Sequence, residues 1–304
     1  MNILLLFEKD SHGDGRYKIT GHRADHIRTI LKAQTSDSID IGILNGPKGT
    51  AEIESIDENK IILSNLKLNA EPDYKNNVDI ICALPRPQTV KKVLFICGMM
   101  AVRNLFFIRA NRVEKSYYHS PLLEKQNLNE HLYDGMMQGK NTRLPNVDIS
   151  DKFKPFFEDF IPKYYKDNNE SPTLLLPHIE TENNIKSVRL SLSKSTPNQN
   201  VPLSGVEGDV SQNRDNSGTP PFNVGSQKNK KPNDDSSSPL SRSSSHLSRE
   251  GGSLITFAIG PEGGWVDFEL DLMESKGFHR IKLSDHTLRV EHALMACLSQ
   301  LEIL

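Results

Sequence analysis

Short apolar runs alternate with amphipathic, helix-like runs over the last three quarters of the chain. Strand-like apolar runs occupy 78–85, 104–110, 171–178, 253–260 and 279–284. Helix-like runs occupy 87–102, 122–141, 267–276 and 291–303. Apolar strands that alternate with helices predict an α/β fold, with a parallel sheet covered on both faces. Ligands of such sheets bind beyond the carboxyl ends of the strands, so we expect a site in the loops after Pro177, Gly260 and Leu283.

The first 70 residues follow a different pattern, in which short strands surround a single helix. A strand is predicted at Ser38–Leu44, and two alternating stretches flank a turn at 57–59. The helix precedes these strands, and its apolar positions are Ile27, Ile30 and Leu31. With no long helix in this part of the chain, the pattern predicts a small β-barrel.

The chain is therefore expected to consist of two domains, one of which is interrupted. The barrel spans 1–72, a polar linker covers 71–77, and the α/β domain spans 78–304. A segment at about 193–252 is rich in Ser, Pro, Asn and Gly and has few large apolar residues. Such a segment cannot bury enough surface to offset its ordering entropy, so it is predicted to be a disordered insertion. A surface loop is favoured over an RNA-contacting or phosphorylated tail.

Charge and cysteine content narrow the possible classes of protein. The formal net charge of −2 by itself predicts no nucleic-acid partner, although local basic patches remain possible. Cys82, Cys97 and Cys297 form neither a paired metal spacing nor a disulfide framework, which fits a reducing compartment. The initial run "MNILLLFEKD" is too short for a secretory signal. We expect a cytoplasmic protein, with an organelle as the alternative.

Four residues, Pro-Glu-Gly-Gly, separate an apolar strand from an acidic helix. In "GPEGG" (260–264) the glycines permit close backbone approach, and the following helix start suits a polar or anionic ligand. The motif is neither the dinucleotide fingerprint G-x-G-x-x-G nor a P-loop. A plain strand-to-helix turn is the alternative interpretation. For the helix itself, Asp267 is the predicted N-cap and Gly277 the predicted C-terminal closure.

A second motif follows about thirty residues later. In "LRVEHA" (288–293) a polar loop opens the final helix. The apolar face of that helix consists of Leu294, Cys297, Leu298 and Leu301. The combination of this motif with "GPEGG" is far more specific than either motif alone.

Together with "LLLPH" (174–178) and "GMMQGKNTRLPNV" (135–147), these motifs resemble the ribosomal RNA small subunit methyltransferase E family. Members of that family methylate N3 of a uridine in 16S-type ribosomal RNA. The resemblance covers most of the chain outside the predicted insertion. It implies an α/β fold of the SPOUT class, with a C-terminal trefoil knot, preceded by a PUA-like barrel. The knot is an implication of the resemblance alone, since ordinary topology rules exclude knots.

The resemblance implies S-adenosylmethionine as the cofactor, bound in a bent form between three loops. It explains the glycines of "GPEGG" as positions where backbone groups meet the cofactor. The residues that it assigns to cofactor binding are Leu176, Pro177, Gly260, Pro261, Gly263, Gly264, Leu283, Ser284 and Leu288.

Methyl transfer to N3 of uracil requires that the methyl donor and the base be positioned in line. It also requires that N3 lose its weakly acidic proton. Arg289 is the candidate cation that favours the anionic base, with Arg112 or Arg143 as alternatives. Glu262 and Glu291 are the candidate proton acceptors. An ion pair between Arg289 and Glu291 at the helix start is an equally weighted structural interpretation.

The resemblance also implies ribosomal RNA as a partner and a homodimer as the assembly. The last helix and the helix after "GPEGG" are the expected dimer contacts. Residues assigned to RNA binding are Arg28, Lys32, Arg112, Gln138 and Arg143. A basic face is expected to consist of Arg16, Lys18, Arg23, Arg28, Lys32, Arg109, Arg112 and Lys115. His22 and His26 lack a third ligand, so no metal is predicted.

Some positions depart from the family pattern. Ser284 and His286 stand where a Gly and an Arg are usual, and His292 replaces a common Thr. These departures leave open a SPOUT methyltransferase that acts on another RNA site. They also leave open a non-catalytic RNA-binding scaffold, which need not bind the cofactor. A nucleotide-binding α/β enzyme that uses "GPEGG" for phosphate is the remaining alternative.

Overall fold

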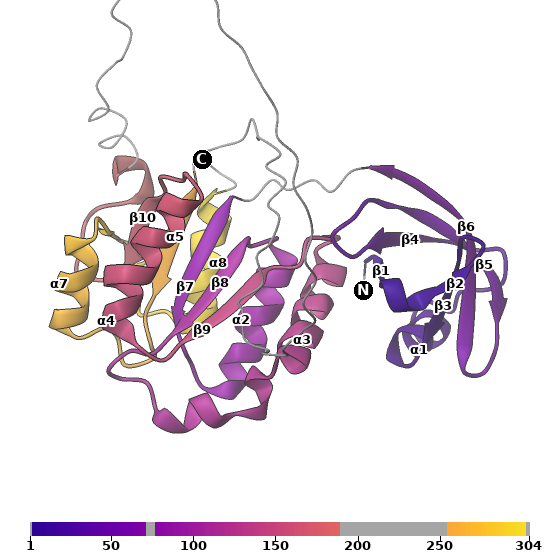
Figure 1. The fold of residues 1–304 in the computed structure, drawn as a ribbon, viewed down its shortest axis with the longest axis horizontal. Helices are drawn as coiled ribbons and strands as arrows, with labels where there is room; N and C mark the ends of the chain where they lie inside the picture. Colours follow the sequence, from indigo (N-terminus) through magenta and orange to yellow (C-terminus); the bar gives the residue numbers. More distant parts are fainter. Residues whose placement is uncertain (1, 71–76, 189–253, 302–304) are drawn as a thin grey trace, which may run out of the picture. The chain divides into compact units, whose positions relative to one another are not determined.

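A computed structural model of the chain describes residues 2–70, 77–188 and 254–301 (Figure 1). The predicted insertion at 193–252 and all of the predicted linker except Asn77 lie outside these residues. The described residues of 1–195 and 251–304 belong to one compact unit. None of the helices in this part of the chain combines the length and the apolar character needed to cross a membrane.

The N-terminal part is a six-stranded sheet with one helix. Its strands are β1 Leu4–Leu6, β2 Ser11–Gly13, β3 Arg16–Thr20, β4 Ser38–Ile43, β5 Lys48–Ile56 and β6 Lys60–Ala70. They are ordered β1-β4-β5-β6-β3-β2, with β1 parallel to β4 and the other pairs antiparallel. The predicted strand at 38–44 and the turn at 57–59 are confirmed. Alternation places one face of each long strand in a core with Ile27 of α1 (His22–Thr29).

The predicted apolar face of the N-terminal helix was wrong at two of its three positions. Ile27 is buried, but α1 ends at Thr29, and Ile30 and Leu31 are 67% and 46% exposed. The backbone leaves the helix at once, because Lys32 adopts a positive φ of 51°. The helical spacing therefore stops one turn earlier than the sequence pattern indicates.

The predicted parallel α/β domain is confirmed. Its strands are β7 Val78–Ala83, β8 Asn104–Ile108, β9 Asn146–Ser150, β10 Thr173–Pro177, β11 Ile255–Ile259 and β12 His279–Ile281. The order is β12-β10-β11-β7-β8-β9, and every pairing in this sheet is parallel. The central strands β7, β8 and β11 are buried at every residue, as expected for a sheet with helices on both faces.

Helices flank this sheet (Figure 1). They include α2 Pro87–Met99, α3 Lys125–Gln138, α7 Asp267–Ser275 and α8 Val290–Leu301. A helical run also spans 153–167, made of α4 Phe153–Pro155, a π-helical turn Phe156–Phe160 and α5 Ile161–Asp167. Neither this run nor β9 was predicted from the sequence. The run contributes aromatic rings that pack edge-on against Phe106 of β8.

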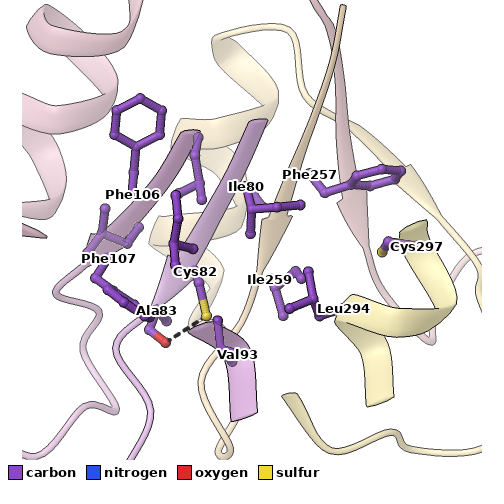
Figure 2. Packing of buried hydrophobic residues seen from close by; sticks show 14 of the residues in the cluster. Ile80, Cys82, Ala83, Val93, Phe106, Phe107, Phe257, Ile259, Leu294 and Cys297 are labelled. Carbon is purple, nitrogen blue, oxygen red and sulfur yellow. Dashed lines mark hydrogen bonds between the residues drawn. The ribbon is translucent and has the colours of Figure 1, made fainter. Parts of the chain in front are cut away.

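The core of this domain joins the central strands to α2 and α8. Figure 2 shows Cys82 of β7 beside Val93 of α2, and Leu294 of α8 beside Ile259 of β11. Cys82, Cys97 and Cys297 are all buried and unpaired, and burial raises the pKa of each thiol. The thiols therefore act as small apolar groups in the core.

Glycines bring α2 and α3 unusually close together. A Cβ on Gly135 of α3 would lie 2.8 Å from the Phe95 carbonyl carbon of α2, and closer still to its oxygen. Gly98 and Gly139 face the backbones of Leu132 and Met99 in the same way. The helices pack backbone to backbone here, because these positions carry no side chain.

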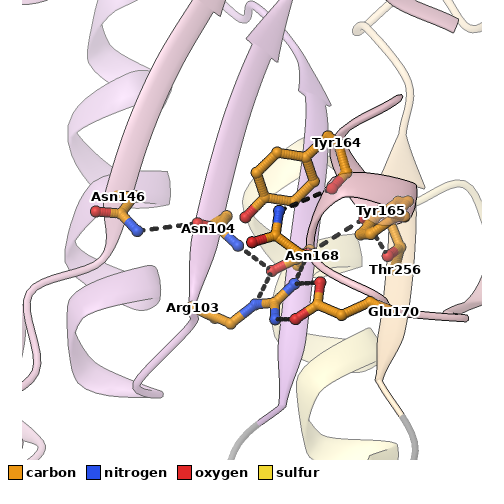
Figure 3. A network of polar contacts seen from close by, with 9 residues as sticks. Arg103, Asn104, Asn146, Tyr164, Tyr165, Asn168, Glu170 and Thr256 are labelled. Atoms are coloured by element: carbon orange, nitrogen blue, oxygen red, sulfur yellow. Dashed lines mark hydrogen bonds and ion pairs between the residues drawn. The ribbon is translucent and has the colours of Figure 1, made fainter. Parts of the chain in front are cut away.

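The amino ends of the central strands share a buried polar network (Figure 3). The Arg103 guanidinium donates to both carboxylate oxygens of Asp79, at 2.8 and 2.5 Å, and also to Glu170. Asp79 accepts further hydrogen bonds from Asn104 at 2.6 Å and from Tyr165 at 3.2 Å. The network thus ties β7 and β8 to the end of the 153–167 helical run.

The start of α7 differs from the prediction, and its end agrees. Val266, not Asp267, occupies the N-cap position, and Asp267 is the first helical residue. The Glu269 carboxylate caps this helix start instead, because it accepts from the N-cap backbone N of Val266 at 3.0 Å. Its other oxygen accepts from Asn111 N, in the segment after β8, at 2.6 Å. Gly277 closes the helix with a φ of 90°, as predicted.

Candidate functional site

Three loops at the carboxyl ends of β10, β11 and β12 enclose a pocket of about 380 Å³. Parallel strands end at the same edge of a sheet, so loops far apart in the sequence converge there. The loop residues that line the pocket are Pro177, His178, Ile179, Glu180, Gly260, Pro261, Glu262, Gly264, Leu283, Ser284, His286, Thr287 and Leu288. The remaining lining residues of the pocket are Arg112, Ile259, Trp265, Asp267, Leu270, Val290 and Ala293.

The glycines of the central loop are required by local geometry. Gly264 has a φ of 73°, a conformation that other residues adopt only with strain. A Cβ on Gly260 would lie 3.0 Å from Trp265 Nε1, and one on Gly263 would lie 3.1 Å from Arg112 Cδ. The loop is therefore folded tightly between an indole ring and an arginine side chain.

Arg112 and the backbone of Arg86 form hydrogen bonds to the loop 260–264. Arg112 donates to the Gly263 carbonyl oxygen, and its aliphatic stem packs on that residue. The Glu262 carboxylate accepts from the backbone N of Arg86 at 3.4 Å, a weak contact. Among the described residues, no carboxylate forms an ion pair with Arg112, so its positive charge remains available to a ligand.

The pocket combines an apolar part with carboxylates. Leu283, Leu288 and Val290 supply apolar surface, whereas Glu180, Glu262 and Asp267 supply negative charge. This combination suits a flat apolar ring attached to a cationic group.

Trp265 has a buried N–H group without a partner. Its Nε1 is inaccessible and makes no hydrogen bond among the described residues, while the residue is 7% exposed. Buried donors are rarely left unpaired, because the loss of hydration costs about 1–3 kcal/mol. Since the ring lines the pocket, its environment is expected to change when the pocket is filled.

A family model of the RNA methyltransferase domain matches residues 72–214 and 229–302, which is more than half of the chain. The chain belongs to the RNA methyltransferase family. The match includes all three loops of the pocket, so the pocket lies in the family's own domain.

Two curated relatives of the chain carry the name ribosomal RNA small subunit methyltransferase E. It is 27% identical over 158 residues to ribosomal RNA small subunit methyltransferase E of Treponema pallidum, covering 51% of this chain and 59% of that one. It is 25% identical over 177 residues to ribosomal RNA small subunit methyltransferase E 1 of Borreliella burgdorferi, covering 58% and 71%. The resemblance found in the sequence is thus confirmed. The first match spans less than two thirds of its relative's length.

Solved structures confirm the fold. Ribosomal RNA small subunit methyltransferase E from Neisseria gonorrhoeae, solved with S-adenosylmethionine, aligns with a TM-score of 0.61 at 13% identity. The alignment covers 100% of this chain and 97% of that one. At this identity the likeness establishes the architecture of the chain and nothing finer.

The residues that the sequence predicted for the cofactor site and for catalysis fall into two groups. Most of the predicted cofactor-binding residues and two predicted side chains, Glu262 and Arg112, line the pocket. Residues outside the described lining are Leu176, which is buried in β10, Gly263, Arg289 and Glu291. The alternative interpretation, an ion pair between Arg289 and Glu291, is contradicted by the contacts of Glu291.

Glu291 pairs with Lys92 of α2 instead, at 2.9 Å. Burial raises the pKa of Glu291, but the hydrogen bond and charge of Lys92 outweigh it, so the pKa is lowered overall. A carboxylate held in its charged form by a lysine is a poor proton acceptor. The contact links α8 to α2, and its partners lie 199 positions apart in the sequence, so no local pattern signals it.

Some arginines of the predicted basic face are bound to other groups of the protein and so are not free to contact RNA. Arg23 is buried in an ion pair with Asp10, so the prediction that it is exposed was wrong. Arg28 donates to the Glu58 carbonyl and to Asp25 at 3.0 Å. Lys32 is exposed in the loop after α1.

Gln138 and Arg143 lie where the N-terminal sheet meets α3. Asn2 Nδ2 donates to the Gln138 carbonyl at 2.8 Å, and Arg143 follows Thr142, whose backbone O accepts from Asn45 N at 2.7 Å. The segment that resembles the family motif therefore joins the two sheets. Its position could not be inferred from spacing, because its partners come from the first 46 residues of the chain.

Proposed function

We propose that the chain transfers a methyl group from S-adenosylmethionine to RNA. The observation that carries this proposal is the pocket formed by the three motif loops at the carboxyl edge of the parallel sheet, within the RNA methyltransferase domain. Open α/β sheets bind their ligands at this edge. The relatives that act on ribosomal RNA and the neighbour solved with S-adenosylmethionine support the proposal.

The pocket residues fit the cofactor. A volume of about 380 Å³ falls in the range of roughly 300–1,000 Å³ typical of small-molecule sites. Leu283, Leu288 and Val290 would contact the adenine ring, and Glu180 or Glu262 would face the cationic groups. Backbone groups of the glycine loop supply the remaining polar contacts. When bound, S-adenosylmethionine supplies an electrophilic methyl group.

The finer activity that we propose is methylation of N3 of a uridine in small-subunit ribosomal RNA. Arg112 would stabilise the negative charge on the base, because its guanidinium lines the pocket and has no carboxylate partner among the described residues. Glu262 would accept the N3 proton at its carboxylate. Arg289 and Glu291 lie outside the lining, so we move the electrostatic role to Arg112.

We propose further that residues 1–72 form a PUA-like RNA-binding barrel and residues 78–304 a SPOUT domain with a trefoil knot. The active form would be a cytoplasmic homodimer that acts on ribosomal RNA. Helices α7 and α8 would form the two-fold contact, which is consistent with the 58% exposure of Phe268 on α7.

Binding of S-adenosylhomocysteine tests the cofactor site. By calorimetric titration, the protein should bind it with a Kd on the order of micromolar, and Gly263→Arg should abolish binding. The new side chain would meet Arg112 at the loop and bring a second positive charge to the pocket mouth. Ser275→Arg, at the exposed end of α7, is the control and should bind normally.

No binding by folded wild-type protein would contradict the methyltransferase proposal and favour a non-catalytic RNA-binding scaffold. Binding that Gly263→Arg leaves intact would place the cofactor elsewhere.

Replacement of Arg112 tests the electrostatic role. Arg112→Met keeps the aliphatic stem and removes the charge, so kcat/KM for methyl transfer to small-subunit particles should fall about 100-fold, against about twofold or less for Arg289→Met. The incorporation of labelled methyl groups measures both. The opposite ranking would return the role to Arg289.

A further inference from the structure

A second and larger hollow lies between the N-terminal sheet and α3. It has a volume of about 1310 Å³ and shares no lining residue with the cofactor pocket. One wall of this cleft consists of Phe7, Lys9, Asp10, Ser11, His12, Lys18, Thr20, His22 and Arg23. The other wall consists of Lys125, Gln126, Asn129, Glu130, Tyr133, Asp134 and Met137 of α3.

The two walls of the cleft are held together by direct contacts. The backbone N groups of Asn2 and Ile3 donate to the Met137 carbonyl at 2.9 and 3.2 Å. The rings of Phe7 and Tyr133 lie 4.8 Å apart, centroid to centroid. The cleft is therefore a fixed hollow in which a ligand would contact both the N-terminal sheet and the methyltransferase domain.

A neutral ion pair forms the base of the cleft. Arg23 binds both carboxylate oxygens of Asp10 at 2.7 Å and also donates to the Leu5 carbonyl at 2.8 Å. Asp10 accepts from Phe7 N at 2.9 Å, and the Arg23 guanidinium lies 4.6 Å from the Phe7 ring centroid. Since these charges cancel, they shape the cleft without attracting a ligand.

The rim of the cleft carries cations that have no acidic partner. Lys9, Lys18 and Lys125 are exposed, and none of them forms an ion pair in the part of the chain that the structure describes. By contrast, Arg16 pairs with Glu54 and Arg28 with Asp25. Lys9, Lys18 and Lys125 therefore bring unpaired positive charge to the cleft.

We infer that this cleft binds the sugar-phosphate backbone of the RNA substrate, and this inference rests on the proposed function. Lysines on both walls meet the charge of phosphates, while His12, His22 and Asn129 offer hydrogen-bond donors. On the α3 wall, the carboxylates of Glu130 and Asp134 repel phosphates and limit the affinity for RNA. The RNA thus contacts both the N-terminal sheet and α3, and not the surface formed by Arg28 of α1 and Lys32 of the following loop.

Charge reversal on each wall tests the inference. The probe is a fluorescein-labelled, 20-nucleotide single-stranded RNA, titrated with the full chain by fluorescence anisotropy at several salt concentrations. Lys18→Glu and Lys125→Glu should each weaken binding about tenfold and reduce the salt slope by about 0.7 for each phosphate that the variant no longer neutralises. Lys163→Glu, an exposed lysine of α5 outside the cleft, is the matched control.

Weaker RNA binding could also result from a variant that fails to fold, so the test includes a variant that is expected to bind RNA more tightly. Glu130→Gln removes one repulsive charge from the α3 wall, so it should bind the same RNA about threefold more tightly. An unfolded or damaged protein would not gain affinity. Unchanged binding by all three cleft variants would overturn the inference.

Two further measurements distinguish RNA binding in the cleft from RNA binding near Lys32 and from a general loss of function. Lys32→Glu should bind RNA as wild type does, and a larger loss of affinity there than for Lys18→Glu and Lys125→Glu would place the RNA on the loop after α1 and overturn the inference. The cleft variants should retain S-adenosylhomocysteine binding. Wild-type protein that binds S-adenosylhomocysteine but not the RNA would overturn the cleft while leaving the methyltransferase proposal standing.

Discussion

Gly135→Ala is expected to lower the free energy of unfolding by about 3 kcal/mol or more, which corresponds to a fall in Tm of about 6–12 °C. The added methyl group would lie 2.8 Å from the Phe95 carbonyl carbon and 3.0 Å from Met99 N. Both are backbone atoms of α2, so no side chain can turn away to make room. Alanine's better helix propensity, about 1 kcal/mol, offsets only part of this cost.

Thermal and urea unfolding followed by circular dichroism measure this effect. Lys91→Ala, on the exposed face of α2, is the matched control and should stay within about 0.5 kcal/mol of wild type. A stable Gly135→Ala protein would mean that α2 and α3 separate easily, contrary to the close packing at Gly98, Gly135 and Gly139.

Arg103→Met is expected to cost about 3–5 kcal/mol, because it leaves the Asp79 carboxylate buried without its cation. Asp79 has no exposed surface, and Arg103 supplies two of its hydrogen bonds. Burial lowers the pKa of Arg103, but its contacts with Asp79 and Glu170 outweigh that effect and raise it overall. The guanidinium therefore remains charged in the folded protein.

The double variant Arg103→Met/Asp79→Asn should recover part of the loss in urea unfolding, because the stranded charge is gone. Glu170→Gln, at the more exposed end of the network, should cost less than Arg103→Met. A loss below about 1 kcal/mol for Arg103→Met would show that water reaches Asp79 and that the network is not sealed.

The elements that the sequence predicted well are those with long apolar runs. Strands β7 and β11 are buried at every residue, and α2 buries seven of its thirteen residues, so their apolar runs are clear. Strand β10 and helix α8 bury fewer residues, but all of their buried positions except Glu291 are apolar. Strand β9 is half exposed and has no apolar run. The helical run at 153–167 contains Pro155 and Pro162 and a π-helical turn, which interrupt the helical repeat.

The position of the pocket could be predicted, but most of its supporting contacts could not. The rule that ligands bind at the carboxyl edge of a parallel sheet led directly to the loops after Pro177, Gly260 and Leu283. The contact between Arg112 and Gly263 and the pair of Lys92 with Glu291 join residues more than 150 positions apart. Such contacts depend on the folded arrangement, and no local pattern signals them.

The strand order also determines when the molecule can fold during synthesis. Strands β7, β8 and β9 are consecutive and adjacent, but the other neighbour of β7 is β11, which begins only at Ile255. At about 5–20 residues per second, the ribosome takes on the order of ten to thirty seconds to make the chain between them. During that interval the apolar edge of β7 has no partner strand, and unpaired edges promote aggregation. The nascent chain is therefore expected to depend on chaperones until β11, which begins at Ile255, emerges from the ribosome.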